Sequence, residues 1–201
     1  MRTPRKILKA CIVSVALMTT AGCMSIEDFN LKIKPFAEWT ERSYEDTRFE
    51  QRYKFSSASE VQVKAAAIDV LSTFKLKLTE KTERQLVASG NLTQFFEKGE
   101  CEHWKAFDEP KSKELSGGLI SLSCNDSSTQ LIAILSTRQF SSGTLITLEY
   151  EISSPQALSM GLKLGKRPTP AASKAGSDKF WALLEKRLGT PVRVAKKEDL
   201  Q

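Results

Sequence analysis

The residues best able to do chemistry in this 201-residue chain are four cysteines and a single histidine. A catalytic triad would have to use His103 as its base, because imidazole is the side chain that exchanges protons near neutral pH. The pattern offers no partner that would orient this ring for acid–base work. We therefore expect no catalytic residues, no cofactor and a protein that is not an enzyme.

The first 22 residues carry the pattern of an export signal. Arg2, Arg5, Lys6 and Lys9 form a positive start, and the run 10–18 that follows is apolar. A helix needs roughly 20 apolar residues to cross a hydrocarbon core of about 30 Å, so this run is too short to span a membrane. Its proportions are typical of a secretory signal peptide.

A lipidation motif follows the apolar run. Thr20-Ala21-Gly22-Cys23 resembles the lipobox of bacterial lipoproteins, in which small residues precede the cysteine, although Thr20 stands where that family usually has Leu. The resemblance implies that Cys23 receives a diacylglycerol, that cleavage removes residues 1–22, and that the new amine is acylated. Stable attachment needs more than one acyl chain, which this modification supplies. Conventional cleavage with secretion, or a retained N-terminal helix, are the alternatives.

The residue after Cys23 indicates where such a protein is sorted. In this family an Asp directly after the cysteine retains the protein at the inner membrane, and here Met24 occupies that place. The resemblance thus implies a lipid anchor in the outer membrane, on its periplasmic side. Residues 23–45 are then the lipidated N-terminus and a tether, or else they pack on the domain through apolar residues such as Phe29 and Trp39.

The net charge of +6 is concentrated in the signal segment. Removing its four basic residues from the total of 30 leaves 26 basic against 24 acidic residues in the mature chain. This near-neutral mature chain lacks the excess of basic residues that is typical of nucleic-acid-binding proteins. We expect no nucleic-acid partner.

Two cysteines remain for structural chemistry, because Cys11 lies in the signal segment and Cys23 would carry lipid. An even pair in an oxidising compartment favours a disulfide, here between Cys101 and Cys124. The competing hypothesis is a metal site that adds His103 to these two thiols, which is a small ligand set without a paired-cysteine motif.

A hairpin would bring the two cysteines together. The stretches 101–107 and 119–124 are expected to be short strands, joined by a loop over 108–118. Pairing them places Cys101 opposite Cys124, and cross-strand neighbours have Cβ atoms about 4.5–5.5 Å apart. The sequence therefore predicts a disulfide that needs little local adjustment.

Hydrophobic periodicity predicts the remaining elements. Strands are expected at 48–55, 75–79, 86–92, 129–140 and 144–153, and helices at 59–74 and 178–188. Ser57 and Glu60 have the spacing of a capping box before the first helix. The stretch 155–177 is expected to be a loop, and 191–201 a polar tail.

Short turns between neighbouring strands predict an antiparallel meander. We expect residues 46–190 to form a single α+β domain, in which both helices pack on one face of one curved sheet. This order of elements is similar to that of helix-grip and TATA-binding-protein-like domains, some of which belong to envelope lipoproteins. The resemblance covers roughly residues 45–190 and rests on element order, so it implies a fold and no function.

Helix-grip folds often enclose an apolar cavity between the sheet and the last helix. The apolar face of that helix is expected to comprise Phe180, Trp181, Leu184 and Leu188, which makes it a possible face for a ligand or a partner. Met160, Leu162 and Leu164 could also touch lipid or a partner, but a solvated loop is favoured there, because single exposed apolar residues are normal.

Together these patterns predict a lipid-anchored envelope lipoprotein that acts as a non-enzymatic periplasmic interaction or assembly module. Its partners would be the membrane, through the acyl chains on Cys23, and an envelope protein or a lipid. The alternative is a domain that binds a hydrophobic ligand such as a lipid, and an enzyme is the least favoured class.

Overall fold

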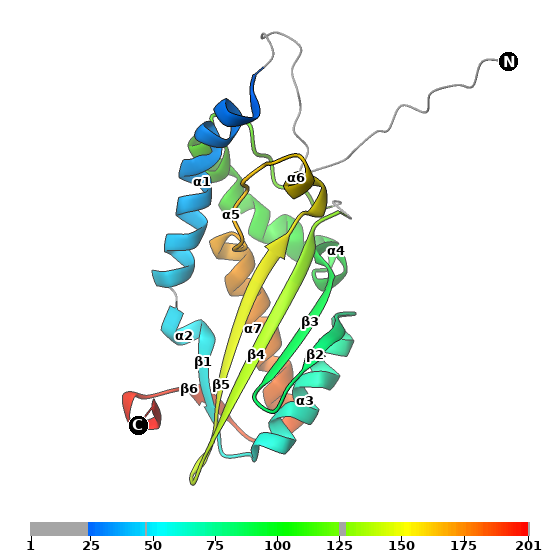
Figure 1. Cartoon of the computed structure of the whole chain (residues 1–201). Helices are drawn as coiled ribbons and strands as arrows, with labels where there is room; N and C mark the ends of the chain where they lie inside the picture. The colour runs from blue at the N-terminus through cyan, green and yellow to red at the C-terminus, as the bar shows by residue number, and fades with distance from the viewer. Residues whose placement is uncertain (1–23, 47, 125–127, 201) are drawn as a thin grey trace, which may run out of the picture.

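One antiparallel sheet organises the protein, whose computed structural model describes residues 24–46, 48–124 and 128–200. The strands of the described part are β1 (Tyr53–Ser56), β2 (Lys77–Lys81), β3 (Gln85–Asn91), β4 (Gln130–Phe140), β5 (Gly143–Ser153) and β6 (Val192–Val194). They lie in the order β2-β3-β4-β5-β1-β6, so β2 and β6 form the two open edges (Figure 1).

The helices of the described part are α1 (Ile26–Asp46), α2 (Arg48–Arg52), α3 (Glu60–Thr73), α4 (Leu92–Phe95), α5 (Lys98–Ser116), α6 (Pro155–Ser159) and α7 (Pro170–Leu188), with a short 3-10 helix at Lys197–Leu200. Helices α3, α5 and α7 lie behind one face of the sheet (Figure 1). The predicted α+β class, with a single antiparallel sheet and helices packed against it, is confirmed. None of the described helices is long and apolar enough to cross a membrane.

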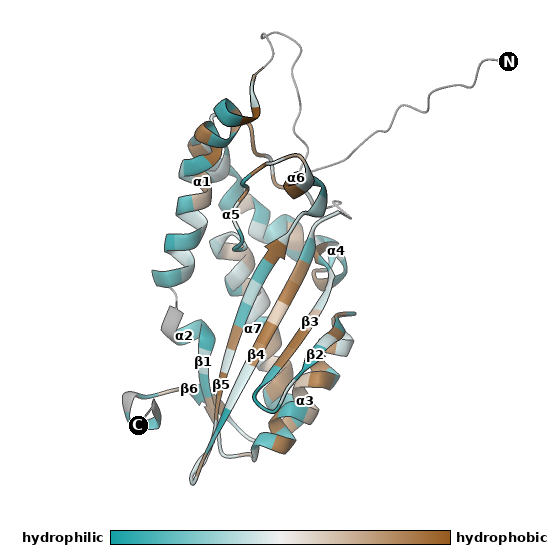
Figure 2. Ribbon diagram, in the orientation of Figure 1, coloured by the Kyte–Doolittle hydropathy of each residue, from teal (hydrophilic) through white to brown (hydrophobic). Residues whose placement is uncertain are grey.

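Alternation along the central hairpin sends one set of side chains into the main core, because successive side chains of a strand point to opposite faces. The buried set on β4 and β5 comprises Leu131, Ala133, Leu135, Ile146, Leu148 and Tyr150. Figure 2 shows the hydrophobic residues gathered along β3 and β4. The predicted strands 129–140 and 144–153 are thus found within one or two residues of their expected bounds.

The helix predicted at 59–74 is confirmed as α3, but its predicted cap is wrong. Ser59 is the N-cap: its hydroxyl accepts a hydrogen bond from the Gln62 N–H at 3.4 Å, and the Gln62 side chain accepts one from the Ser59 N–H at 3.0 Å. The capping box therefore begins two residues after Ser57, and Glu60 lies in the first helical turn.

Residues 98–116 form the helix α5, where the pattern predicts a strand and a loop, so that prediction is wrong. The buried positions recur at helical spacing and are Cys101, Trp104, Asp108, Ser112 and Ser116. Three of these five are polar, so a search for apolar periodicity misses the helix. Gly117 ends it with a φ of +59°, a conformation that glycine adopts at little cost. Residues 119–124 follow as an extended segment outside the sheet, and not as the predicted strand.

Three further predictions need correction at element ends. The expected strand 48–55 is the short helix α2 followed by β1, and the expected loop 155–177 contains α6 and the first turns of α7. The expected tail 191–201 contains β6, which pairs with β1 and so extends the sheet beyond residue 190.

Helix α1 packs on the domain, which is the second of the two alternatives for this segment. Ile33 is fully buried and Phe36 is nearly so, and both join Ile120 in a second core cluster. The helix lies beside α5. The described part of the segment 23–45 is therefore a structured layer and not a free tether.

Candidate functional site

A disulfide joins Cys101, near the start of α5, to Cys124, at the end of the extended segment. The Cα atoms of the two residues are 5.7 Å apart. The predicted pairing is confirmed, but the predicted hairpin is wrong, because the bond ties a helix to a segment that belongs to no strand. Its effect is to hold one end of residues 119–124 against α5.

The disulfide consumes both thiols and rules out a metal site built from them and His103. The ring of His103 instead lies 5.2 Å from that of Phe107, one turn further along α5, and the Phe107 side chain is 65% exposed. Within the residues that the structure describes, no group of three or more His, Cys, Asp or Glu could hold a metal ion. The lipobox, residues 20–23, lies outside the described residues, which begin with Met24.

The apolar face predicted on the last helix lies in the main core. Phe180 and Leu184 are fully buried, Trp181 is 6% exposed, and Leu188 packs against the same cluster. The indole Nε1 of Trp181 donates a hydrogen bond to the Gln51 carbonyl at 2.7 Å, which fixes the ring in place. Phe180, Trp181 and Leu184 could be reached by a partner only if the core opened, whereas Leu188 is half-buried at the margin of the core.

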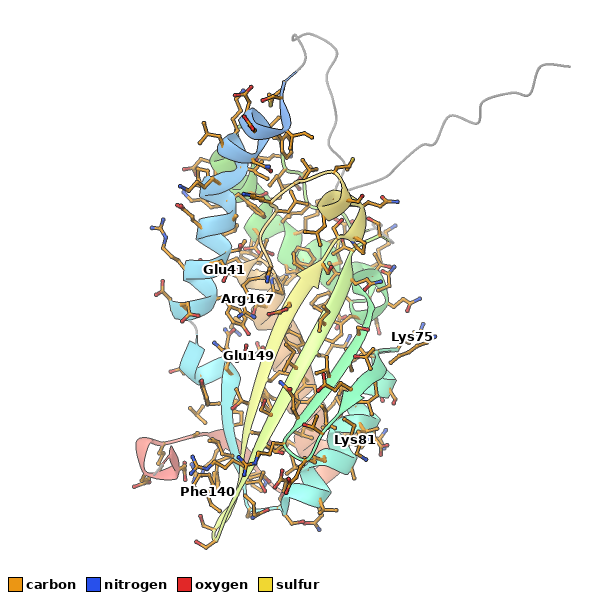
Figure 3. All side chains as sticks on the ribbon, in the orientation of Figure 1. Glu41, Lys75, Lys81, Phe140, Glu149 and Arg167 are labelled. Carbon is orange, nitrogen blue, oxygen red and sulfur yellow. A yellow bond between two sulfur atoms is a disulfide. The ribbon has the colours of Figure 1, made fainter. Side chains whose placement is uncertain are left out.

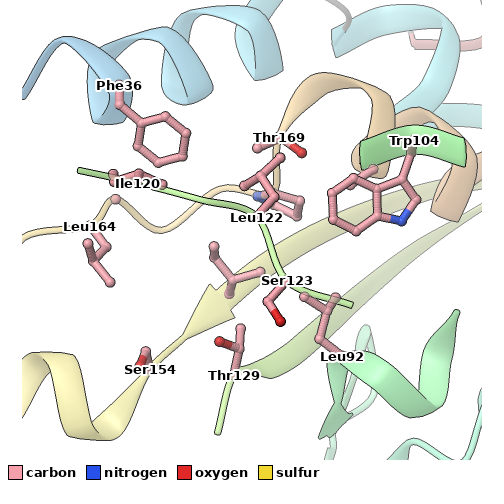
Figure 4. Close-up of a pocket in the computed structure, with 14 residues that line it drawn as sticks. Phe36, Leu92, Trp104, Ile120, Leu122, Ser123, Thr129, Ser154, Leu164 and Thr169 are labelled. Atoms are coloured by element: carbon pink, nitrogen blue, oxygen red, sulfur yellow. The ribbon is translucent and has the colours of Figure 1, made fainter. Parts of the chain in front are cut away.

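An apolar pocket of about 100 Å³ lies elsewhere, between α1, the extended segment and the end of the sheet (Figure 4). Its lining includes Phe36 of α1, Trp104 of α5, Ile120 and Leu122 of the extended segment, and Leu164 and Ala172. Typical small-molecule sites measure about 300–1,000 Å³, so this pocket is too small for a whole drug-sized ligand. It is closer to the cavity of about 150 Å³ that accepts a single benzene ring. The pocket can take one apolar side chain or the end of an acyl chain.

Serine side chains of α5 hold the wall that the extended segment forms. The Ser116 hydroxyl accepts a hydrogen bond from the Ile120 N–H at 3.0 Å, and the Ser112 hydroxyl donates to the Ile120 carbonyl at 3.4 Å. Both serines are buried, so these bonds satisfy backbone groups that water cannot reach. Together with the disulfide, they fix both ends of the segment that contributes Ile120 and Leu122 to the pocket.

Asp108 fixes another wall, the start of α7. Its carboxylate accepts hydrogen bonds from the N–H groups of Ala171 at 2.9 Å and Ala172 at 3.4 Å, which are free donors in the first turn of the helix. Burial raises the pKa of Asp108 above its usual range, and the hydrogen bonds to the carboxylate oppose that rise. Asp108 therefore positions Ala172 in the pocket lining.

A charged cluster joins α1 to the sheet beside the pocket (Figure 3). The Arg167 guanidinium lies 3.6 Å from Glu41, 3.7 Å from Glu149 and 3.5 Å from Glu151, and its Cζ is 4.2 Å from the centre of the Tyr44 ring. Burial raises the pKa of Tyr44, while the positive charges nearby oppose that rise. The cluster anchors the loop before α7 and has the composition of a structural ion-pair network.

The loop after α6 separates the three apolar residues singled out in the sequence. Met160 is 42% exposed, Leu162 is half-buried, and Leu164 lines the pocket. Asn30 of α1 fixes this loop: its Nδ2 donates to the Gly161 carbonyl at 2.8 Å, and its Oδ1 accepts from the Lys163 N–H at 2.9 Å.

No protein-family model, curated protein or solved structure matches the chain significantly. The candidate site is therefore defined by its geometry alone. Most of its residues had no signal in the sequence, because they come from separate segments and are ordinary apolar residues. Leu164 is the one pocket residue that the sequence pattern pointed to, and no spacing rule connects it with Trp104 or Ala172.

Proposed function

We propose that the chain is a lipid-anchored envelope protein of the outer membrane, facing the periplasm, which acts as a non-enzymatic interaction module. The apolar pocket is the observation that carries this proposal. Its walls are fixed by the disulfide, the serines of α5 and Asp108, and its volume of about 100 Å³ suits one apolar side chain. A pocket of this kind is typical of the anchor points of protein interfaces, where a few buried side chains supply most of the affinity.

Two further observations support the compartment and the class. A disulfide between Cys101 and Cys124 is the form that these thiols adopt in an oxidising compartment such as the periplasm. The export signal and lipobox pattern point to the same place. The proposal gives no residue a catalytic role, and it treats His103 as an exposed residue of α5 that contacts Phe107.

The test is photo-crosslinking in cells with a photoreactive phenylalanine analogue placed at Leu164. We expect a discrete adduct with an envelope protein, and none from the same analogue at Val61, an exposed residue of α3. Ala172→Leu fills the pocket and should abolish the adduct. Ala65→Leu makes the same substitution at an exposed position of α3 and should leave the adduct unchanged. An adduct that survives Ala172→Leu, or no protein adduct from Leu164, would contradict the proposal.

The apolar lining also favours a second candidate, the binding of a hydrophobic ligand. A pocket of this size holds only the end of an acyl chain. Native mass spectrometry of a soluble Cys23→Ser form separates the two functions. Ligand binding predicts a co-purifying lipid that Ala172→Leu displaces, whereas a side-chain pocket predicts the mass of the protein alone in both forms.

A further inference from the structure

Exposed apolar side chains gather at the end of the molecule where the described chain begins. Of the nine large hydrophobic residues that are exposed in the described part, four are Met24, Ile26, Leu158 and Met160, with exposed fractions of 40%, 54%, 64% and 42%. We call these four residues the tip patch. The first turn of α1 and the helix α6 both lie at the upper end of the molecule in Figure 1.

The two halves of the tip patch are held together by packing and hydrogen bonds. A Cβ atom at Gly161 would lie 3.6 Å from the Cγ2 of Ile26, so this loop touches the start of α1. The Asn30 side chain bonds to the backbone on both sides of Leu162, at Gly161 and at Lys163. Gly161 has a φ of +76°, which lets the chain turn directly after Met160. The patch is therefore a preformed surface and not a set of independent side chains.

Charges around the tip patch are of both signs. Glu27 and Asp28 lie in the first turn of α1, and Lys32 and Lys163 are exposed nearby. Because acidic and basic side chains are mixed there, they give no preference for a surface of one strong charge. Four exposed apolar side chains among charges of both signs suit the interface of a lipid bilayer. Such side chains insert there to a depth of about 5–10 Å.

We propose that the tip patch lies in the membrane interface, with Leu158 and Met160 inserted beside the acyl chains on Cys23. This inference rests on the proposed lipid anchor, because Met24 is covalently next to Cys23 and the patch begins there. The patch adds a second contact on another segment of the chain. One covalent anchor leaves the domain free to tilt, whereas an anchor with an adjacent inserted surface fixes its orientation. The turn between β4 and β5, at the opposite end of the molecule, then points away from the membrane (Figure 1).

The test uses the full lipidated protein with one introduced thiol, labelled with an environment-sensitive fluorophore. Cys101 and Cys124 are in a disulfide and Cys23 carries lipid, so the thiol introduced by Met160→Cys is the one that reacts. The labelled protein is reconstituted in vesicles of phosphatidylethanolamine and phosphatidylglycerol that contain lipids with a nitroxide quencher near the start of the acyl chain. Matched controls carry the label on Val61→Cys, at a position that is 78% exposed on α3, and on Ser142→Cys in the turn between β4 and β5.

We expect the fluorescence at position 160 to fall by about half in vesicles with quencher, because the label sits within the shallow acyl region. The labels at 61 and 142 should lose almost none of their fluorescence. If the protein is lipidated and bound to vesicles but the label at 160 is quenched no more than the control labels, this inference is overturned and the proposed anchor is not. Protein that carries no acyl chains and does not bind vesicles would overturn the proposed anchor itself. Shielding of position 160 from an aqueous quencher without quenching by the lipid would indicate a protein partner there, and would also overturn the inference.

Discussion

The side-chain amide of Asn30 bridges α1 to the loop after α6, donating to the Gly161 carbonyl at 2.8 Å and accepting from the Lys163 N–H at 2.9 Å. These residues are far apart in the chain, so Asn30 makes the start of α1 and the loop a single rigid end. The start of α1 is thereby tied to the loop that lines the pocket through Leu164.

Asn30→Ala should lower the free energy of unfolding by about 1 kcal/mol, because hydrogen bonds near the surface contribute about that much each and these are partly replaced by water. The more specific result is faster hydrogen exchange at the Lys163 amide, measured by NMR. Lys34→Ala, at an exposed ion pair with Glu38, is the matched control and should change neither quantity appreciably. An unchanged exchange rate at Lys163 would show that Asn30 does not hold the loop.

Substitutions at Asp108 should separate its hydrogen bonds from its charge. Asp108→Ala removes the acceptor for the N–H groups of Ala171 and Ala172 and should lower the free energy of unfolding by about 1–3 kcal/mol. Asp108→Asn keeps an acceptor oxygen and should lower it much less. Urea unfolding of the three proteins at neutral pH measures the difference, and equal losses in both variants would contradict this role.

The stability of the wild-type protein should also depend on pH through Asp108. Burial raises the pKa of this carboxyl in the folded state above its unfolded value of about 3.9, so the folded form binds the proton more tightly. Its contribution to stability is fully present below that unfolded pKa and is lost as the pH rises through the folded pKa. The unfolding free energy of the wild type, measured from pH 3 to pH 7, should therefore include a fall that is due to Asp108. The same measurement on Asp108→Asn should lack that fall. A variant whose pH profile runs parallel to the wild type would contradict the assignment.

Removing the disulfide should destabilise the domain and loosen one wall of the pocket. Cys101 and Cys124 are 23 residues apart, and closing a loop of this length is worth about 3 kcal/mol on the chain-entropy account. The double variant Cys101→Ser/Cys124→Ser should lose that amount, and dithiothreitol should bring the wild type to the same unfolding midpoint. The reductant should leave the double variant unchanged, which controls for other effects. A wild-type midpoint that does not move on reduction would argue against the bond in the native protein.

Phe180 should behave as a core residue and not as a binding residue. Phe180→Ala removes a fully buried ring and should cost about 3–5 kcal/mol of unfolding free energy. Phe107→Ala removes a ring that is 65% exposed on α5 and should change stability by about 0.5 kcal/mol or less. Thermal unfolding monitored by circular dichroism distinguishes the two, and a similar small loss in both would show that the last helix is not packed as described.

Much of the sheet was predictable because its strands follow the simplest pattern. In β4 and β5, Leu131, Leu135, Ile146 and Leu148 occur at every second or fourth position, and the turn at Ser141 to Gly143 marks the hairpin. The helix α3 was predictable for the same reason, since Val63 and its neighbours repeat at helical spacing. In these elements the core is apolar, so hydrophobic periodicity and burial agree.

The helix α5 was not predictable in this way, because its buried face is largely polar. Asp108, Ser112 and Ser116 are buried through hydrogen bonds to other segments, which no local pattern records. The short stretch at Cys101 was expected to be a strand, but it does not alternate: Cys101, Trp104 and Phe107 are three residues apart, a spacing compatible with the helix that forms. The disulfide was predicted correctly although its local geometry was not, because that prediction rested on the number of cysteines and on the expected compartment, and not on the elements that carry them.

The pocket could not be predicted, since its walls meet only in the folded chain. Phe36, Trp104, Leu122 and Ala172 come from different elements, and each is an ordinary core residue in its own segment. The face predicted on the last helix had the stronger sequence signal, yet it packs against the sheet. Apolar periodicity reports which side of a helix is buried and does not report whether a partner or the protein itself covers it.

The intact mass of the native protein tests the proposed lipid anchor at Cys23 most directly. Protein purified from membranes with detergent should have the mass of residues 23–201 plus a diacylglyceryl group on Cys23, with or without one further acyl chain on the amine, less two hydrogens for the disulfide. Cys23→Ser should lack the acyl mass and leave the membrane fraction. A polypeptide that still begins at Met1, carries free thiols and stays in the cytosolic fraction would contradict the account.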